Sequence, residues 1–147
     1  MNVQKIKKAI LIISIVLLII VFLIVMSVRR SMRENPLLFI PEEVIQSNLL
    51  ETIPIGTSMG DVGIIVAGNR EWTIRVIRED LGVVLNSSGI PWRGNSMPGF
   101  TVIGEQSIEI HIGTYYFITR IDVGAYLAFN KDGELIEIFV RREYDVL

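Results

Sequence analysis

Few residues of this chain have side chains suited to catalysis or metal binding. The single histidine, His111, stands two positions after Glu109, and the chain contains no cysteine. In an extended segment this spacing puts both side chains on one face of a strand. One histidine is too little for a His-based metal cluster, and without cysteine there is no thiolate ligand, disulfide or Cys nucleophile. No Gly-x-Ser-x-Gly sequence is present to expose a catalytic serine. We therefore predict no catalytic residue, no metal site and no cofactor.

One short segment, Asn130-Lys131-Asp132-Gly133, looks like part of a calcium-binding loop. Aligning Gly133 with the glycine of such a loop puts Ala128 at the first ligand position and Phe139 at the last, where carboxylates are required. The segment is therefore predicted to be a four-residue hairpin turn, with Gly133 at the position that needs a positive φ.

Aromatic residues give a better indication of function. Trp92 lies in segment 86–99, which is rich in Gly, Pro, Ser and Asn, while Tyr115, Tyr126 and Phe139 fall on the sheet face opposite the Ile and Val residues. Exposed aromatic side chains on a sheet mark partner-binding surfaces. We therefore predict a protein-binding surface formed by these four aromatic residues. The alternative is that helices cover this face.

These residues follow a strongly apolar segment, Ala9 to Val28, which contains no charge, proline or glycine. Its 20 residues would span about 30 Å as a helix, which is the thickness of a bilayer core. In lipid a single segment must satisfy its own backbone hydrogen bonds, and only a helix does so. The sequence therefore predicts a transmembrane helix whose first partner is the lipid bilayer.

Residues 1–8 form a short basic tail in front of this span. The apolar region of a cleavable signal peptide has about 7–15 residues and an Ala-x-Ala-like ending, whereas this apolar run is longer and lacks such an ending. We therefore expect an uncleaved signal-anchor. Cleavage near Ser27 is the alternative. Basic residues flank both ends of the span, so the positive-inside rule gives nearly a tie. We expect a cell-membrane protein with the N-terminus in the cytoplasm and the C-terminal domain outside.

The charge of the rest of the chain is strongly negative. All 16 carboxylate residues lie from Glu34 onward, against eight of the 14 Lys and Arg residues, which leaves this part with a formal charge of −8. A domain this acidic repels nucleic acid, so we predict no nucleic-acid partner. An extracytoplasmic domain without cysteine is commoner in bacteria than in animal secretory proteins, and we expect a bacterial source.

The chain is predicted to have an α+β fold: a single N-terminal transmembrane helix, then two short helices packed on an antiparallel β-meander of about four strands. Residues 29–40 are expected to be a linker and residues 41–147 the folded domain. Apolar residues every fourth position predict the first short helix after Pro41. A Ser58–Asp61 capping box predicts the start of the second.

The last third of the chain alternates apolar and polar residues with the period of two that is typical of strands. A four-residue turn would pair Leu127 with Ile136, Ala125 with Ile138, and Asp122 with Arg141. The residues expected to face inward are Ile108, Ile110, Ile112, Ile121, Val123, Ala125, Leu127, Phe129, Ile136, Ile138 and Val140.

Two short motifs give a resemblance to a known family. The start of the second helix contains Ile55-Gly56-Thr57 followed by Asp61-Val62, and the final hairpin contains Phe129, Asp132, Gly133 and Leu135. The chain from about residue 41 to 143 resembles the β-lactamase-inhibitor-protein-like (BLIP-like) fold, also seen in small envelope lipoproteins of the SmpA/OmlA type. The resemblance implies a non-catalytic domain with a protein-binding sheet. The lipidated cysteine of those lipoproteins is missing, so their envelope-assembly role is not carried over.

These observations predict a single-pass membrane protein whose acidic outer domain serves protein–protein interaction in the cell envelope and is not an enzyme. Two alternatives remain open at this point. One is a small-molecule sensor or enzyme with a site under the 86–99 loop. The other is a structural accessory subunit of a membrane complex.

Overall fold

The computed structural model describes residues 3–34, 40–116 and 120–144. It divides into two compact units, Met1–Pro36 and Leu37–Leu147. The first unit contains helix α1, Val3–Glu34. Within it, Ile10–Arg30 is long and apolar enough to cross a membrane, and the side chains of this segment are exposed. Helix begins within the predicted basic tail and continues through the first part of the predicted linker, so the boundaries at residues 8 and 29 are not helix ends.

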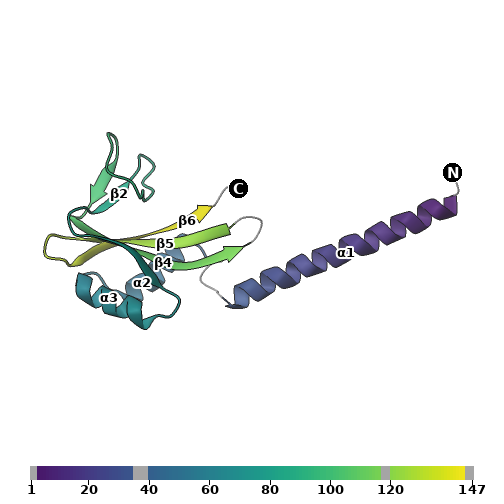
Figure 1. Cartoon of the computed structure of the whole chain (residues 1–147), viewed down its shortest axis with the longest axis horizontal. Helices are drawn as coiled ribbons and strands as arrows, with labels where there is room; N and C mark the ends of the chain where they lie inside the picture. Colours follow the sequence, from purple (N-terminus) through teal and green to yellow (C-terminus); the bar gives the residue numbers. More distant parts are fainter. Residues whose placement is uncertain (1–2, 35–39, 117–119, 145–147) are drawn as a thin grey trace. The chain divides into compact units, whose positions relative to one another are not determined.

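Two short helices precede the sheet, as predicted. Helix α2, Glu42–Thr52, buries Ile45 and Leu49, and helix α3, Met59–Gly68, buries Val62 and Val66. The side-chain oxygen of Ser58 accepts the backbone N–H of Asp61, which confirms the predicted cap. Both helices lie on the same face of the sheet (Figure 1). The amphipathic pattern of the sequence therefore gave the correct packing faces.

The main sheet has four antiparallel strands in the order β1-β4-β5-β6. Its strands are β1 Thr73–Arg78, β4 Gln106–Tyr116, β5 Arg120–Phe129 and β6 Leu135–Tyr144. The α+β architecture with an antiparallel sheet confirms the predicted fold class. The helices and one sheet face enclose the main core, whose fully buried large side chains include Ile45, Ile110, Leu127, Phe129 and Ile138.

A second, two-stranded sheet lies on the other face (Figure 1). It pairs β2 Val83–Leu85 with β3 Thr101–Ile103, and the segment between these strands is the loop predicted at 86–99. A Cβ on Gly82 would lie 2.2 Å from the Ile103 carbonyl oxygen, so only glycine allows the two chain segments to approach so closely. The sequence did not predict β3, because three residues are too few to show an alternating pattern.

The positive φ of Gly133 in the β5–β6 turn was predicted correctly, but the four-residue length of the turn and the strand register were not. Gly133 has φ +74°, as expected. Phe129 pairs with Leu135 rather than Glu134, which shifts the register by one residue, and a bulge at Ile136 shifts it by one more. Leu127 therefore pairs with Ile138 rather than Ile136. The bulge turns Ile136 outward, where it is 40% exposed, so its assignment to the inward-facing set is wrong. The remaining pairs are shifted by two residues: Ala125 pairs with Val140, Gly124 with Arg141 and Asp122 with Glu143.

Candidate partner-binding site

The sheet face opposite the helices carries polar side chains from all four strands. We call it the charged face. It consists of Arg75, Glu109, His111, Thr114, Asp122, Tyr126, Arg141 and Glu143.

Arg93, from the 86–99 loop, joins this face. Its Nε and Nη2 atoms lie 2.8 Å and 2.6 Å from Glu109 Oε1, and its Nη1 atom lies 2.7 Å from Glu143 Oε2. Because a guanidinium can bridge two carboxylates through its fixed fork of donors, one side chain ties the loop to both β4 and β6. Arg141 adds a second tie by donating to the carbonyl oxygen of Pro91. The loop is therefore fixed on the charged face.

His111 forms part of a chain of hydrogen bonds on this face. Arg75 Nη2 lies 2.8 Å from His111 Nδ1, and since a guanidinium can only donate, Nδ1 accepts. His111 Nε2–H then donates to Thr114 Oγ1, 3.2 Å away, and the Thr114 hydroxyl donates to Asp122 Oδ1. The imidazole is neutral in this arrangement. Its pKa is lowered by partial burial and by the nearby positive charge of Arg75. His111 is thus half-buried and bonded rather than an ordinary surface residue.

The carboxylate of Asp122 is stabilised by hydrogen bonds from three neighbouring side chains. Partial burial acts to raise its pKa, but hydrogen bonds from Thr114, Arg120 and Arg75 outweigh burial and lower the pKa to about 2. Burial raises the pKa of Tyr126, and the negative charges of Glu109 and Glu143 raise it further. Asp122 is therefore ionised and Tyr126 protonated at neutral pH. Neither group has the intermediate pKa of a general acid or base.

Three of the four predicted binding residues are not on an open surface. Tyr126 is 5% exposed and packs with Val83 and Leu85 of the second sheet, and Phe139 packs against the same cluster. The expectation of an exposed aromatic face is therefore wrong, because the β2–β3 ribbon covers it, and not the helices. Tyr115 is also buried, in the core on the helix side.

The position of Tyr115 has a separate cause. The register between β4 and β5 shifts between His111 and Gly113. A single extra residue moves every later side chain of the strand to the opposite face of the sheet. Tyr115, which pairs with Ile121, therefore points into the core, and Thr114 points toward Asp122.

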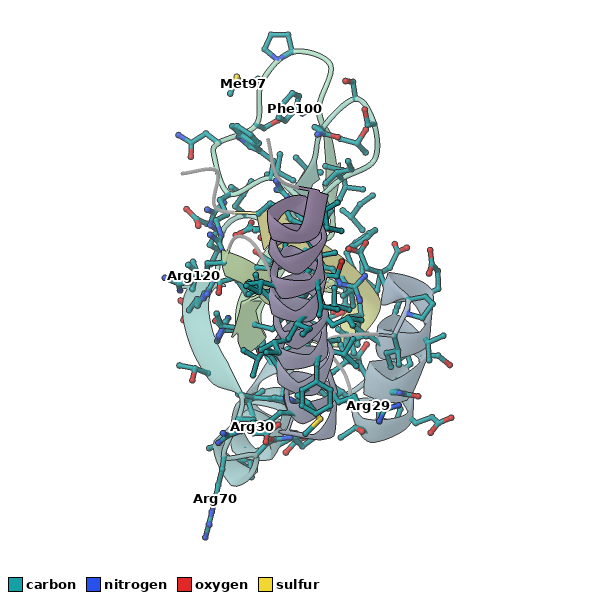
Figure 2. The ribbon with its side chains drawn as sticks, turned by 90° about the vertical axis from the view of Figure 1, so that its right-hand side faces the viewer. Arg29, Arg30, Arg70, Met97, Phe100 and Arg120 are labelled. Atoms are coloured by element: carbon teal, nitrogen blue, oxygen red, sulfur yellow. The ribbon has the colours of Figure 1, made fainter. Side chains whose placement is uncertain are left out.

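Trp92 is the predicted binding residue that remains exposed. Its ring meets Phe100 edge to face, with 6.0 Å between ring centroids. Ile90, Trp92, Met97 and Val102 are each between 38% and 49% exposed, and we call them the apolar loop surface. Figure 2 shows Met97 and Phe100 on the part of the loop that projects away from the sheet. Ile90, Trp92 and Met97 belong to the loop and Val102 to β3. Exposed large apolar side chains of this kind are typical of a contact surface.

The space beneath Trp92 and Arg93 of the loop is small. A pocket lined by Val84, Trp92, Arg93, Glu109 and Tyr126, among others, has a volume of about 20 Å³. This is roughly the room that one water molecule requires. Within residues 3–34, 40–116 and 120–144, no three His, Cys, Asp or Glu side chains are grouped so that they could hold a metal ion.

Sequence reasoning missed Arg93 and Glu143, which fix the loop. The sequence contained one signal: the loop holds a single charged residue, Arg93, directly after its only tryptophan. The guanidinium of a loop arginine is suited to binding a carboxylate partner on another element. Its identity depends on the register of β4 and β6, which bulges obscure.

Comparisons with protein-family models, with curated proteins and with solved structures find no match to this chain. The fold itself defines the class: an α+β domain that follows an apolar helix of membrane-spanning length.

Proposed function

We propose that this chain is a single-pass membrane protein whose domain of residues 41–147 lies outside the cytoplasm and binds another protein. The observation that carries the proposal is the apolar loop surface. Exposing four large apolar side chains to water is unfavourable, and a partner that covers them recovers the hydrophobic free energy.

The fixed position of the loop supports this proposal. Arg93 binds two carboxylates, the Trp92 N–H donates to the Val84 carbonyl oxygen at 2.7 Å, and Pro91 forms a β-bridge with Leu85. A loop already held in one conformation loses little entropy when a partner binds. The pocket beneath Trp92 and Arg93 is too small for most ligands, which makes a sensor or enzyme site at that place the less favoured alternative.

Membrane anchoring rests on α1. A helix with apolar, exposed side chains around its whole circumference is unfavourable in water and suited to lipid. The proposed orientation rests on the short basic tail before the span and the acidic domain after it. A reporter active only in the cytoplasm, fused after Leu147, should therefore be inactive. An active, intact fusion would reverse the orientation. The resemblance to the BLIP-like fold remains a proposal and agrees with a protein-binding role.

The binding proposal is tested by site-specific photo-crosslinking in native membranes. A photoreactive amino acid at Met97 should give a discrete crosslinked species, and the same residue at the exposed Lys131 in the β5–β6 turn should not. Replacing Trp92 with Ser should weaken the Met97 crosslink. Equal crosslinking at both positions would mean that the loop is not a preferred contact surface.

A further inference from the structure

The outer edge of β6 carries backbone hydrogen-bonding groups, and side chains of α2 already bond two of them. β6 is an outer strand of the main sheet. Gln46 Nε2 donates to the Ile138 carbonyl oxygen at 2.7 Å, and Glu42 Oε1 accepts the Arg142 N–H at 3.0 Å. Side chains of α2 thus take the places that a neighbouring strand would otherwise fill.

Val140 lies midway between these two edge positions. Backbone groups of a strand point to alternate edges with a period of two, so the N–H and C=O of Val140 point to the same side as the Ile138 carbonyl and the Arg142 N–H. Val140 also lines a groove with a volume of about 410 Å³. The backbone edge of β6 is therefore reachable from this groove.

The groove has two walls of different character. One wall is formed by Glu42, Glu43 and Gln46 of α2, and the other by Asn86, Ile90 and Pro91 of the loop, while Phe139, Arg141 and Arg142 lie along β6 itself. Arg142 forms an ion pair with Glu42, and Arg141 donates to the Pro91 carbonyl oxygen, so both arginines are bonded to the walls of the groove. The Glu43 side chain is exposed at the first turn of α2. The groove thus joins a strand edge, apolar side chains, the exposed carboxylate of Glu43 and two arginines that are already bonded to its walls.

We propose that an extended segment of a partner protein binds in this groove as an added strand on β6. Backbone hydrogen bonds to β6 would supply affinity and side-chain contacts would supply specificity, which is the established mode of β-strand addition. The segment places an apolar side chain against Ile90 and Phe139, and a Lys or Arg beside Glu43, in keeping with the domain charge of −8 from residue 34 onward. Ile90 also belongs to the apolar loop surface, so the inference rests on the proposed function and extends it.

The opposite edge of the sheet is less suited to strand addition. The pairing of β1 with β4 shifts between Ile74 and Val76, and Arg75 at that bulge is held by His111 and Asp122. A bulge interrupts the regular spacing that an added strand needs and protects an edge from such pairing.

The test uses the full chain in lipid nanodiscs and a phage-displayed library of random heptapeptides. Selected peptides should alternate apolar and basic residues, and synthetic copies should bind the chain measurably by fluorescence anisotropy. Val140→Pro removes the outward N–H without removing a bond to β5, because proline is tolerated at such edge positions. We expect Val140→Pro to weaken peptide binding about tenfold or more, because a hydrogen bond is lost and the proline ring blocks the edge. Val140→Ala should change peptide binding by about twofold at most.

Three further measurements keep the result decisive. Gln46→Ala releases the Ile138 carbonyl and should strengthen peptide binding several-fold, whereas a merely structural role of Gln46 would weaken it. Glu43→Lys should weaken binding of the basic peptides. If Val140→Pro fails to fold, slower hydrogen exchange of the Val140 amide on peptide addition to the unmodified chain decides instead.

Two outcomes overturn strand addition. Failure to select any peptide is one. The other is equal binding to the Val140→Pro and Val140→Ala chains with loss of binding on Trp92→Ser, which would place the peptide on the loop. The Met97 crosslink to a partner protein is independent of these results, so failure of the inference is distinguishable from failure of the proposed function.

Discussion

Replacing Arg93 with Met tests how the loop is held. The change keeps an unbranched apolar stem but removes the charge that bridges Glu109 and Glu143. The Glu109 side chain is 7% exposed and would keep only Arg75, at 3.8 Å, while Arg93 itself is 43% exposed. Breaking a buried ion pair costs about 3–5 kcal/mol and an exposed pair contributes about 0.2–1 kcal/mol, so we expect an intermediate loss of about 2 kcal/mol. For a domain of this size that lowers Tm by roughly 8 °C.

The assay is thermal unfolding of the full chain in detergent micelles, followed by near-UV circular dichroism. Arg70→Met is the matched control, because the Arg70 side chain extends away from the fold (Figure 2) and should change Tm by about 2 °C at most. In a double-mutant cycle, Glu109→Gln combined with Arg93→Met should cost less than the sum of the two changes. If Arg93→Met shifts Tm no more than Arg70→Met, and the two changes are additive, the ion pairs do not hold the loop.

Three further predictions follow from the sheet. Gly133→Val should destabilise the domain by about 1–2 kcal/mol and Gly133→Asn by less, because Gly133 has φ +74°. A Cβ at this position would meet Gln106 Oε1 at an ordinary contact distance of 3.7 Å, so the cost comes from the backbone, and equal melting temperatures for Gly133→Val and the parent would contradict the turn. Cysteines at Ala125 and Val140 should form a disulfide under mild oxidation, whereas Ala125 with Ile138 should not, and the reverse result would restore the simpler register. The pKa of His111 is lowered in the folded chain, so the unfolded chain takes up a proton at a higher pH than the folded chain does. The contribution of His111 to the free energy of unfolding is therefore fully present above pH 6.5 and is lost as the pH falls below that value. His111→Gln should flatten the curve of stability against pH in that range.

Patterns that depend on a few neighbouring residues were predicted well from the sequence. The every-fourth spacing of Ile45 and Leu49, the Ser58 cap and the Gly133 turn each involve contacts over about one helical turn or less, and each appears in the structure. The α+β class followed from the change of period from helix to strand. These features need no knowledge of distant parts of the chain.

Features that depend on bulges and on distant segments were not predicted. One extra residue near Ile112 turned Tyr115 inward. On β6, one extra residue in the turn and one at Ile136 together shifted the partners by two positions. Gly113 directly follows the β4 bulge and is the kind of strand glycine that marks one, whereas no glycine or proline marks the β6 bulge at Ile136. The covering of Tyr126 by the β2–β3 ribbon depends on contacts between segments some forty residues apart (roughly, from Leu85 to Tyr126), which local periodicity does not encode. Trp92 stayed exposed because it lies in the loop, whose side chains follow no sheet alternation.

The central claim is that a partner protein covers the apolar loop surface outside the cytoplasm. Because the chain contains no cysteine, a single Met97→Cys or Lys131→Cys change gives one reactive thiol. A membrane-impermeant maleimide should label both variants at similar rates in the purified chain. In intact cells, or in spheroplasts if an outer layer blocks the reagent, Lys131→Cys should still be labelled and Met97→Cys should be protected. Equal labelling of Met97→Cys and Lys131→Cys in cells would contradict a covered loop, and no labelling of either before lysis would contradict a domain outside the cytoplasm.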